Sequence, residues 1–128
     1  MFVKVVVPLL VLVLAVTSEK LVGAPEDADI NDPSIKQALR FAVAEYNTKS
    51  NSIYTSKVVK VISAQSQVVS GAKYIITVKM ATTSCKKADA KKKCTVHSDP
   101  AIAKPRKCKL AVWSQPWLNR MELVENTC

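Results

Sequence analysis

Apolar residues recur at helical spacing between Asp32 and Asn47. They fall at steps of three and four residues, at Ile35, Ala38, Leu39, Ala42, Val43 and Tyr46. This spacing places them on one face of an α-helix. Asp32 is a good N-cap, and Pro33 is favoured at the first helical position. We therefore expect one amphipathic helix that begins at Asp32-Pro33 and ends in the polar stretch 47–51.

The rest of the chain follows the period of β-strands. We expect strands at about 53–67, 72–82, 108–115 and 121–127, each rich in β-branched and apolar residues. In the second of these, Tyr74, Ile76 and Val78 alternate with polar positions, as in a strand with one buried face. The helix has to bury its apolar face against these strands. The pattern predicts an α+β fold with one helix packed on an antiparallel sheet.

The stretch Gln67-Val68-Val69-Ser70-Gly71 joins the first two of these strands, and its composition is unusual for a hairpin. Such turns favour Asn, Asp, Gly or Ser, whereas this one carries two adjacent valines. Exposed apolar side chains at a loop tip are unfavourable unless they meet a partner. Two interpretations remain: the valines form a contact loop, or the strand continues for two more residues.

The first residues resemble a secretion signal. Lys4 precedes an apolar run from Val5 to Val16, and small residues follow up to Ser18. The run is too short for a membrane span, and no second such run follows. We expect a signal peptide at 1–18, a secreted domain at 19–128 and no membrane span.

The net charge of +9 is concentrated in one region. Residues 85–107 have no apolar period and carry eight basic residues against Asp89 and Asp99. A run of this kind is often only a solvated surface. One functional alternative is nevertheless a cationic, anion-binding or antimicrobial protein that uses the Lys-rich loop, residues 86–109, to bind polyanions. Aromatic residues for base stacking are absent from this loop.

Four cysteines in a short secreted chain indicate two disulfides, which could pair in three ways. A turn at Pro116-Trp117 would bring Cys108 and Cys128 close together across a hairpin. The remaining pair, Cys85 and Cys94, would then close the Lys-rich loop. A zinc site formed by Cys85, Cys94, His97 and Cys108 is the alternative, although its spacing matches no paired Cys motif.

Candidate catalytic residues are scarce. His97 is the only histidine, and Gly23 and Gly71 are the only glycines, so the chain has no Gly-rich phosphate loop. The carboxylates do not form an obvious pair. We therefore expect neither an enzyme nor a cofactor or metal.

Three separated elements resemble the secreted, type 2 cystatins. They are Gly23 near the expected mature N-terminus, Gln67-Val68-Val69-Ser70-Gly71 in the first hairpin and Pro116-Trp117 in the second. The signal peptide and the four cysteines match that type as well. The resemblance implies a five-stranded antiparallel sheet wrapped around one long helix. It also implies reversible, non-covalent inhibition of papain-like cysteine proteases such as cathepsins.

The resemblance also assigns roles to residues. Leu21 and Val22 would occupy non-primed subsites of the protease, Gly23 would let the chain turn away from the nucleophile, and Trp117 would lie on the primed side. In an antiparallel meander the two hairpin turns project from the same end, which would place Val68 and Val69 beside Pro116-Trp117. The protease-binding residues would then be Leu21, Val22, Gly23, Gln67, Val68, Val69, Ser70, Gly71, Pro116 and Trp117.

The same resemblance implies a second site, and the first hairpin bears on the association state. Some type 2 cystatins inhibit legumain through an asparagine in Ser-Asn-Asp after the helix. Here the matching stretch is Ser50-Asn51-Ser52, which keeps Asn51 but lacks the aspartate. We expect a monomer. Strain at Val68-Val69 in a tight turn would permit opening of the hairpin and a domain-swapped dimer.

Overall fold

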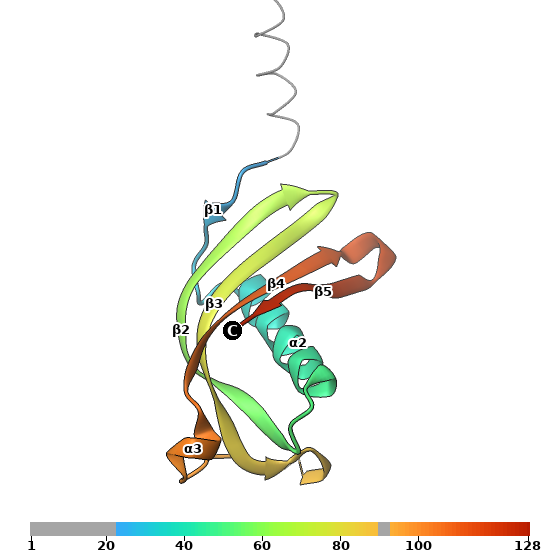
Figure 1. Ribbon diagram of the computed structural model, residues 1–128. Coiled ribbons are helices and arrows are strands. Elements are labelled where there is room, and N and C mark those ends of the chain that lie inside the picture. Colours follow the sequence, from blue (N-terminus) through green and yellow to red (C-terminus); the bar gives the residue numbers. More distant parts are fainter. Residues whose placement is uncertain (1–22, 90–92) are drawn as a thin grey trace, which may run out of the picture.

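The sheet has five antiparallel strands in the order in which they occur along the chain. In the computed structural model, which describes residues 23–89 and 93–128, they are β1 (Glu26–Asp27), β2 (Tyr54–Val69), β3 (Gly71–Lys86), β4 (Arg106–Gln115) and β5 (Arg120–Thr127). Helix α2 (Pro33–Lys49) lies on the hollow side of the curved sheet (Figure 1). The predicted α+β fold is confirmed. The expected signal peptide, Leu21 and Val22 lie outside the described residues.

Helix α2 begins where the sequence predicts. The Asp32 carboxylate accepts a hydrogen bond of 2.8 Å from the Ser34 N–H, and Pro33 occupies the first helical position. Near its C-terminus, the Asn47 side chain donates to the Ser56 carbonyl and accepts from the Ser56 N–H, at 3.0 and 2.8 Å. These two bonds fix the end of the helix to β2. Among the described helices, none is long and apolar enough to cross a membrane.

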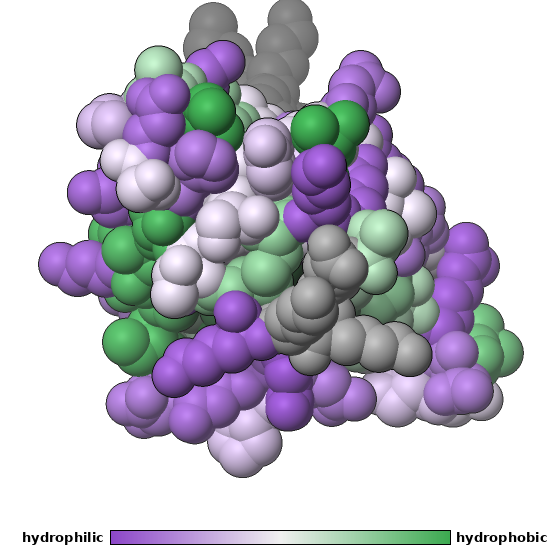
Figure 2. All heavy atoms as spheres, turned by 90° about the horizontal axis from the view of Figure 1, so that it is seen from below, coloured by the Kyte–Doolittle hydropathy of each residue, from purple (hydrophilic) through white to green (hydrophobic). Residues whose placement is uncertain are grey.

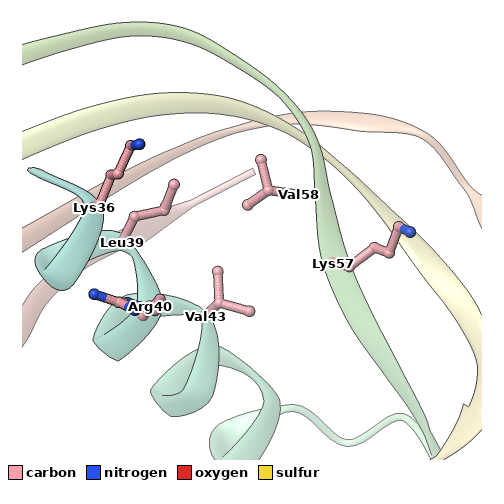
Figure 3. A pocket seen from close by; sticks show the side chains of 6 residues that line it. All are labelled: Lys36, Leu39, Arg40, Val43, Lys57 and Val58. Carbon is pink, nitrogen blue, oxygen red and sulfur yellow. The ribbon is translucent and has the colours of Figure 1, made fainter. Parts of the chain in front are cut away.

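The core lies between α2 and the inner face of the sheet. Its most deeply buried large side chains are Ile35, Ile76, Val78, Met80, Leu110 and Val112. Leu39 and Val43 are only half-buried. They point, with Val58, into a groove of about 460 Å³ between α2 and β2 (Figure 3). The predicted apolar face is therefore wider than the part that the sheet covers.

The hairpin between β2 and β3 is tighter than expected. Val68 and Val69 are the last residues of β2 and pair with Ala72 and Gly71, which leaves Ser70 as the only link. The strand thus continues for two residues, as one interpretation held, yet Val68 is still 75% exposed. The positive φ of the turn, +96°, falls on Gly71, and neither valine has one. The expectation of backbone strain at Val68 and Val69, on which the domain-swapped dimer depended, was therefore wrong.

The segment between β3 and β4 contains structure that the sequence pattern did not predict. Helix α3 (Pro100–Ala103) begins at Asp99, whose carboxylate accepts from the Ala101 N–H at 2.9 Å. A 3₁₀ turn, η1, covers Lys87–Asp89. Both elements are too short to show an apolar period. Figure 2 shows this end of the molecule, where hydrophilic side chains form much of the surface.

Both disulfides are present in the structure. Cys85 is bonded to Cys94 with the Cα atoms 5.6 Å apart, and Cys108 is bonded to Cys128 with the Cα atoms 4.0 Å apart. The three cysteines of the zinc alternative are therefore all in disulfides. His97 packs edge-on against the Tyr54 ring, with the ring centres 5.3 Å apart.

Candidate functional site

The two hairpin tips lie at the same end of the sheet. Figure 1 shows the β2–β3 tip and the β4–β5 tip at the upper end, with α3 and the β3–β4 connection at the lower end. This arrangement follows from the strand order, because alternate connections of an antiparallel meander project from the same edge. The sheet therefore brings residues 67–71 and 116–117 to one end of the molecule.

The first tip is fastened to β4 by two side chains. The Trp113 indole N–H donates to the Ser70 carbonyl at 2.8 Å, and the Gln115 amide donates to the Ser70 hydroxyl at 3.3 Å. The sequence pattern did not assign these two residues to the site. Alternation along β4 does point both side chains to the face opposite Leu110 and Val112, but it gives no indication of what they bond.

Gly71 lies where no side chain fits. A Cβ atom at this position would be 2.2 Å from the Ser114 carbonyl oxygen and 3.1 Å from the Gln115 Cγ. The φ of +96° is also one that residues with a Cβ rarely adopt. The glycine thus allows β3 to turn immediately after Ser70 while the tip packs on β4.

The N-terminal arm is joined to the first hairpin at Gly23. The Gly23 N–H donates to the Val68 carbonyl at 3.2 Å, and the Gln67 amide donates to the Gly23 carbonyl at 2.8 Å. A Cβ atom on Gly23 would lie 3.1 Å from the Val68 carbonyl oxygen and 3.3 Å from the Val68 Cβ. The described part of the chain therefore begins beside the first tip.

The second tip is a single 3₁₀ turn, η2 (Pro116–Leu118), that ends at Asn119. Asn119 has a φ of +48°, and its N–H donates to the Pro116 carbonyl at 3.0 Å. The turn exposes two large apolar side chains, with Trp117 64% and Leu118 58% accessible. Trp117 was among the predicted site residues, but Leu118 was not, although its position directly after Pro-Trp was an available signal.

These segments form a surface suited to binding. Gly23 and the two tips present glycine, apolar, hydroxyl and amide groups, and residues 67–71 and 115–119 include no histidine, cysteine or carboxylate. Exposed apolar side chains gathered at one end of a domain commonly mark a protein-interaction surface. We refer to Gly23, residues 67–71 and residues 116–118 as the binding edge.

Asn51 is not part of the binding edge. It is exposed in the connection between α2 and β2, which lies at the opposite end of the sheet (Figure 1). The Ser50 hydroxyl accepts from the Ser52 N–H at 3.1 Å, and the Ser52 hydroxyl accepts from the Tyr54 N–H at 3.1 Å. The Lys87 ammonium group also donates to the Ser50 carbonyl. The hydrogen bonds of the adjacent residues thus hold the loop that exposes the Asn51 side chain.

The fold and the site together define a class of protein. A helix packed on a five-stranded antiparallel sheet, with a glycine-containing arm and two apolar tips at one end, is the architecture of a cystatin-type binding domain. Residues 23–117 match the cystatin domain. The chain belongs to the cystatin family. Members of this family are inhibitors of cysteine proteases, so at the family level the chain is an inhibitor and not an enzyme.

Individual relatives agree with this assignment. The chain is 49% identical over 125 residues to a cystatin of Oncorhynchus keta, covering 98% of this chain and 96% of the relative. It is 45% identical to a cystatin-C of Paralichthys olivaceus, covering 96% and 97% of the two chains. The crystal structure of dimeric human cystatin F superposes with a TM-score of 0.71 at 29% identity, covering 84% of this chain and 86% of that one.

Proposed function

We propose that this chain is a secreted, reversible and non-covalent inhibitor of papain-like cysteine proteases of the cathepsin type. Residues 1–18 would be removed as a signal peptide, and residues 19–128 would act as a monomeric inhibitor. The binding edge would enter the active-site cleft as a wedge. Leu21 and Val22 would fill non-primed subsites, and Trp117 would contact the primed side.

The observation that supports this proposal most directly is the bonding between the parts of the binding edge. Gly23 is bonded to Val68 and Gln67, and Ser70 is bonded to Trp113 at the base of the second hairpin. The surface is therefore held in shape before it meets a protease. A preorganised surface loses less conformational entropy on binding than a flexible one.

The energies available to such a wedge are sufficient. Burying a valine or leucine side chain contributes about 1.5–3 kcal/mol, and truncating a tryptophan in a desolvated contact costs roughly 2–4 kcal/mol. Several such contacts, less the costs of ordering and association, can reach the approximately −12 kcal/mol that corresponds to a nanomolar dissociation constant. Because the tips present turns whose backbone is bonded within the sheet, they fill the cleft without offering it an extended peptide to cleave.

The direct experiment is titration of active-site-calibrated papain with the oxidised protein, residues 19–128. We expect stoichiometric loss of activity, with activity recovered after dilution or displacement. Papain that remains fully active in a large molar excess of the protein would refute the proposal.

Substitutions at Gly23 should weaken inhibition in proportion to their size. Gly23→Ala places a Cβ only a few tenths of an ångström too close to Val68, so we expect a small loss. Gly23→Trp adds a large side chain at this close contact and should raise the inhibition constant for papain about tenfold, which corresponds to about 1.4 kcal/mol. Ala44→Trp is the matched control, because Ala44 is an exposed residue of α2 and is not part of the binding edge. Equal inhibition by the wild type and Gly23→Trp would exclude a close contact at this point.

Legumain inhibition through Asn51 is the second activity that we propose. The exposed side chain and the bonded loop support it. Ser52 stands where the Ser-Asn-Asp stretch of some type 2 cystatins has its aspartate, and its hydroxyl accepts a hydrogen bond from the Tyr54 N–H. Asn51→Ala and Asn51→Gln should each weaken inhibition of legumain at least tenfold and leave inhibition of papain unchanged. Legumain that is unaffected by the wild-type protein, in a preparation that inhibits papain, would remove this activity alone.

A further inference from the structure

The three central strands of the sheet contain no acidic residue. Their sequences include eight basic residues: Lys57 and Lys60 in β2, Lys73, Lys79 and Lys86 in β3, and Arg106, Lys107 and Lys109 in β4. The carboxylates of the chain lie elsewhere, before and within α2, between β3 and β4, and in β5. The excess positive charge is thus built into the sheet itself and extends beyond the Lys-rich loop.

Three of these lysines form one row across the sheet. Lys60 pairs with Lys79, and Lys79 pairs with Lys107, so neighbouring strands place an ammonium group at the same level. Directly opposed residues point to the same face, with Cβ atoms about 5 Å apart. The neighbouring pairs Val61 with Val78 and Val78 with Cys108 face the core, so this row, the lysine ladder, lies on the outer face, away from α2.

A β-bulge places Lys60 in the ladder. Val58 pairs with the buried Met80, and two residues later regular alternation would also turn Lys60 toward the core. The register shift between Val58 and Lys60 inserts one residue and reverses the direction of the side chain. Bulges are specific features that re-aim side chains, often at functional positions.

The ladder lacks local charge compensation. Lys60, Lys79 and Lys107 are all exposed. Within residues 23–89 and 93–128, the ion pairs are Lys49 with Glu45, Lys109 with Glu125, and Arg120 with Glu122, and none of them includes a ladder lysine. Like charges that face each other across strands destabilise a sheet. An extended anion on this face would replace repulsion with attraction.

The next row favours a particular kind of anion. Ser63 pairs with Thr77, and Thr77 pairs with Lys109, so hydroxyl groups flank the ladder. Hydroxyl groups can bond the oxygens of sulfate and sugar groups. Neither row contains an aromatic side chain, and stacking on aromatic residues is a main source of affinity for single-stranded nucleic acids.

We propose that the outer face of the sheet, formed by the lysine ladder with Ser63 and Thr77, binds linear sulfated polysaccharides. The ladder lies eight residues along β3 from Gly71, a distance of about 26 Å in an extended strand. A polysaccharide bound there leaves the binding edge free. The protein is therefore expected to inhibit papain while it is attached to a sulfated surface.

The test measures binding of the oxidised protein, residues 19–128, to a heparin oligosaccharide by calorimetry at several salt concentrations. The triple variant Lys60→Gln/Lys79→Gln/Lys107→Gln should bind at least tenfold more weakly, with a shallower dependence of affinity on salt. The control Lys36→Gln/Lys86→Gln/Lys93→Gln changes the net charge equally at exposed positions outside the ladder and should lose less than threefold. Unchanged inhibition of papain by both variants shows that they are folded.

Three outcomes would overturn the proposal. Equal losses in the two triple variants would mean that binding follows net charge alone. Tighter binding to a single-stranded oligonucleotide, or to phosphatidylserine-containing vesicles, than to heparin would assign the face to another partner. Absence of heparin binding by the wild type at 0.05 M salt would remove the site, whatever the result with papain.

Discussion

Replacing Trp117 by alanine is expected to raise the inhibition constant for papain about a hundredfold, which corresponds to about 2.8 kcal/mol. The indole is 64% exposed at the end of the β4–β5 hairpin and would become buried only in the complex. Tryptophan at the centre of an interface is a typical hot spot. The measurement is the inhibition constant from progress curves, with the dissociation rate expected to account for most of the change.

The chain offers a matched control for this variant. Ile53 is 63% exposed but lies immediately before β2, at the end of the sheet opposite the binding edge. Ile53→Ala removes exposed apolar surface of similar accessibility and should leave the inhibition constant within twofold of wild type. If the two variants behave alike, the second tip does not enter the cleft and the wedge needs another contact.

The fold was predictable from the sequence where the chain obeys a local rule. The Asp32-Pro33 cap, the helical apolar spacing and the alternation in β3 each depend on near neighbours, and the structure confirms the helix and strands that they predicted. The short elements β1 and α3 were missed, because two or four residues are too few to show a period. The same Asp-Pro signature begins α2 and α3, but only α2 continues as an apolar face.

The contacts between distant segments could not be predicted in the same way. The Arg106 guanidinium donates to the Tyr46 hydroxyl at 2.7 Å and to the Ser56 hydroxyl at 2.8 Å, which links β4, α2 and β2. The bond from Trp113 to Ser70 is of the same kind. The bond from Arg106 to Ser56 depends on the strand register and on two bulges in β2, and regular alternation contains no information about a bulge. The bond from Trp113 to Ser70 depends on the register between β3 and β4.

The candidate site was therefore predictable in its parts but not in its assembly. Resemblance selected Gly23, the first hairpin and Pro116-Trp117, and meander topology placed the two tips at one end. The first tip is fastened to β4 by Trp113 and Gln115, whose side chains lie beside the tip and not in it. The rigidity of the binding edge is thus a property of the sheet that supports it.

That rigidity is the basis of the last prediction, which concerns Gly71. Gly71→Ala would place a Cβ atom 2.2 Å from the Ser114 carbonyl oxygen at a φ of +96°. Backbone strain of this kind costs roughly 1–3 kcal/mol, and the backbone clash adds to it. We expect the free energy of unfolding in urea to fall by about 3 kcal/mol. Inhibition of papain should weaken as well, because the first tip must move away from β4.

Ser70→Ala is the control for the hairpin. It removes only the hydroxyl that accepts from Gln115 at 3.3 Å and retains the carbonyl that accepts from Trp113, so it should lower the free energy of unfolding by about 1 kcal/mol or less. A Gly71→Ala protein within 0.5 kcal/mol of wild type would contradict the close packing of β3 against Ser114. A protein that is destabilised but inhibits papain normally would show that the cleft, and not β4, holds the first tip in its bound shape.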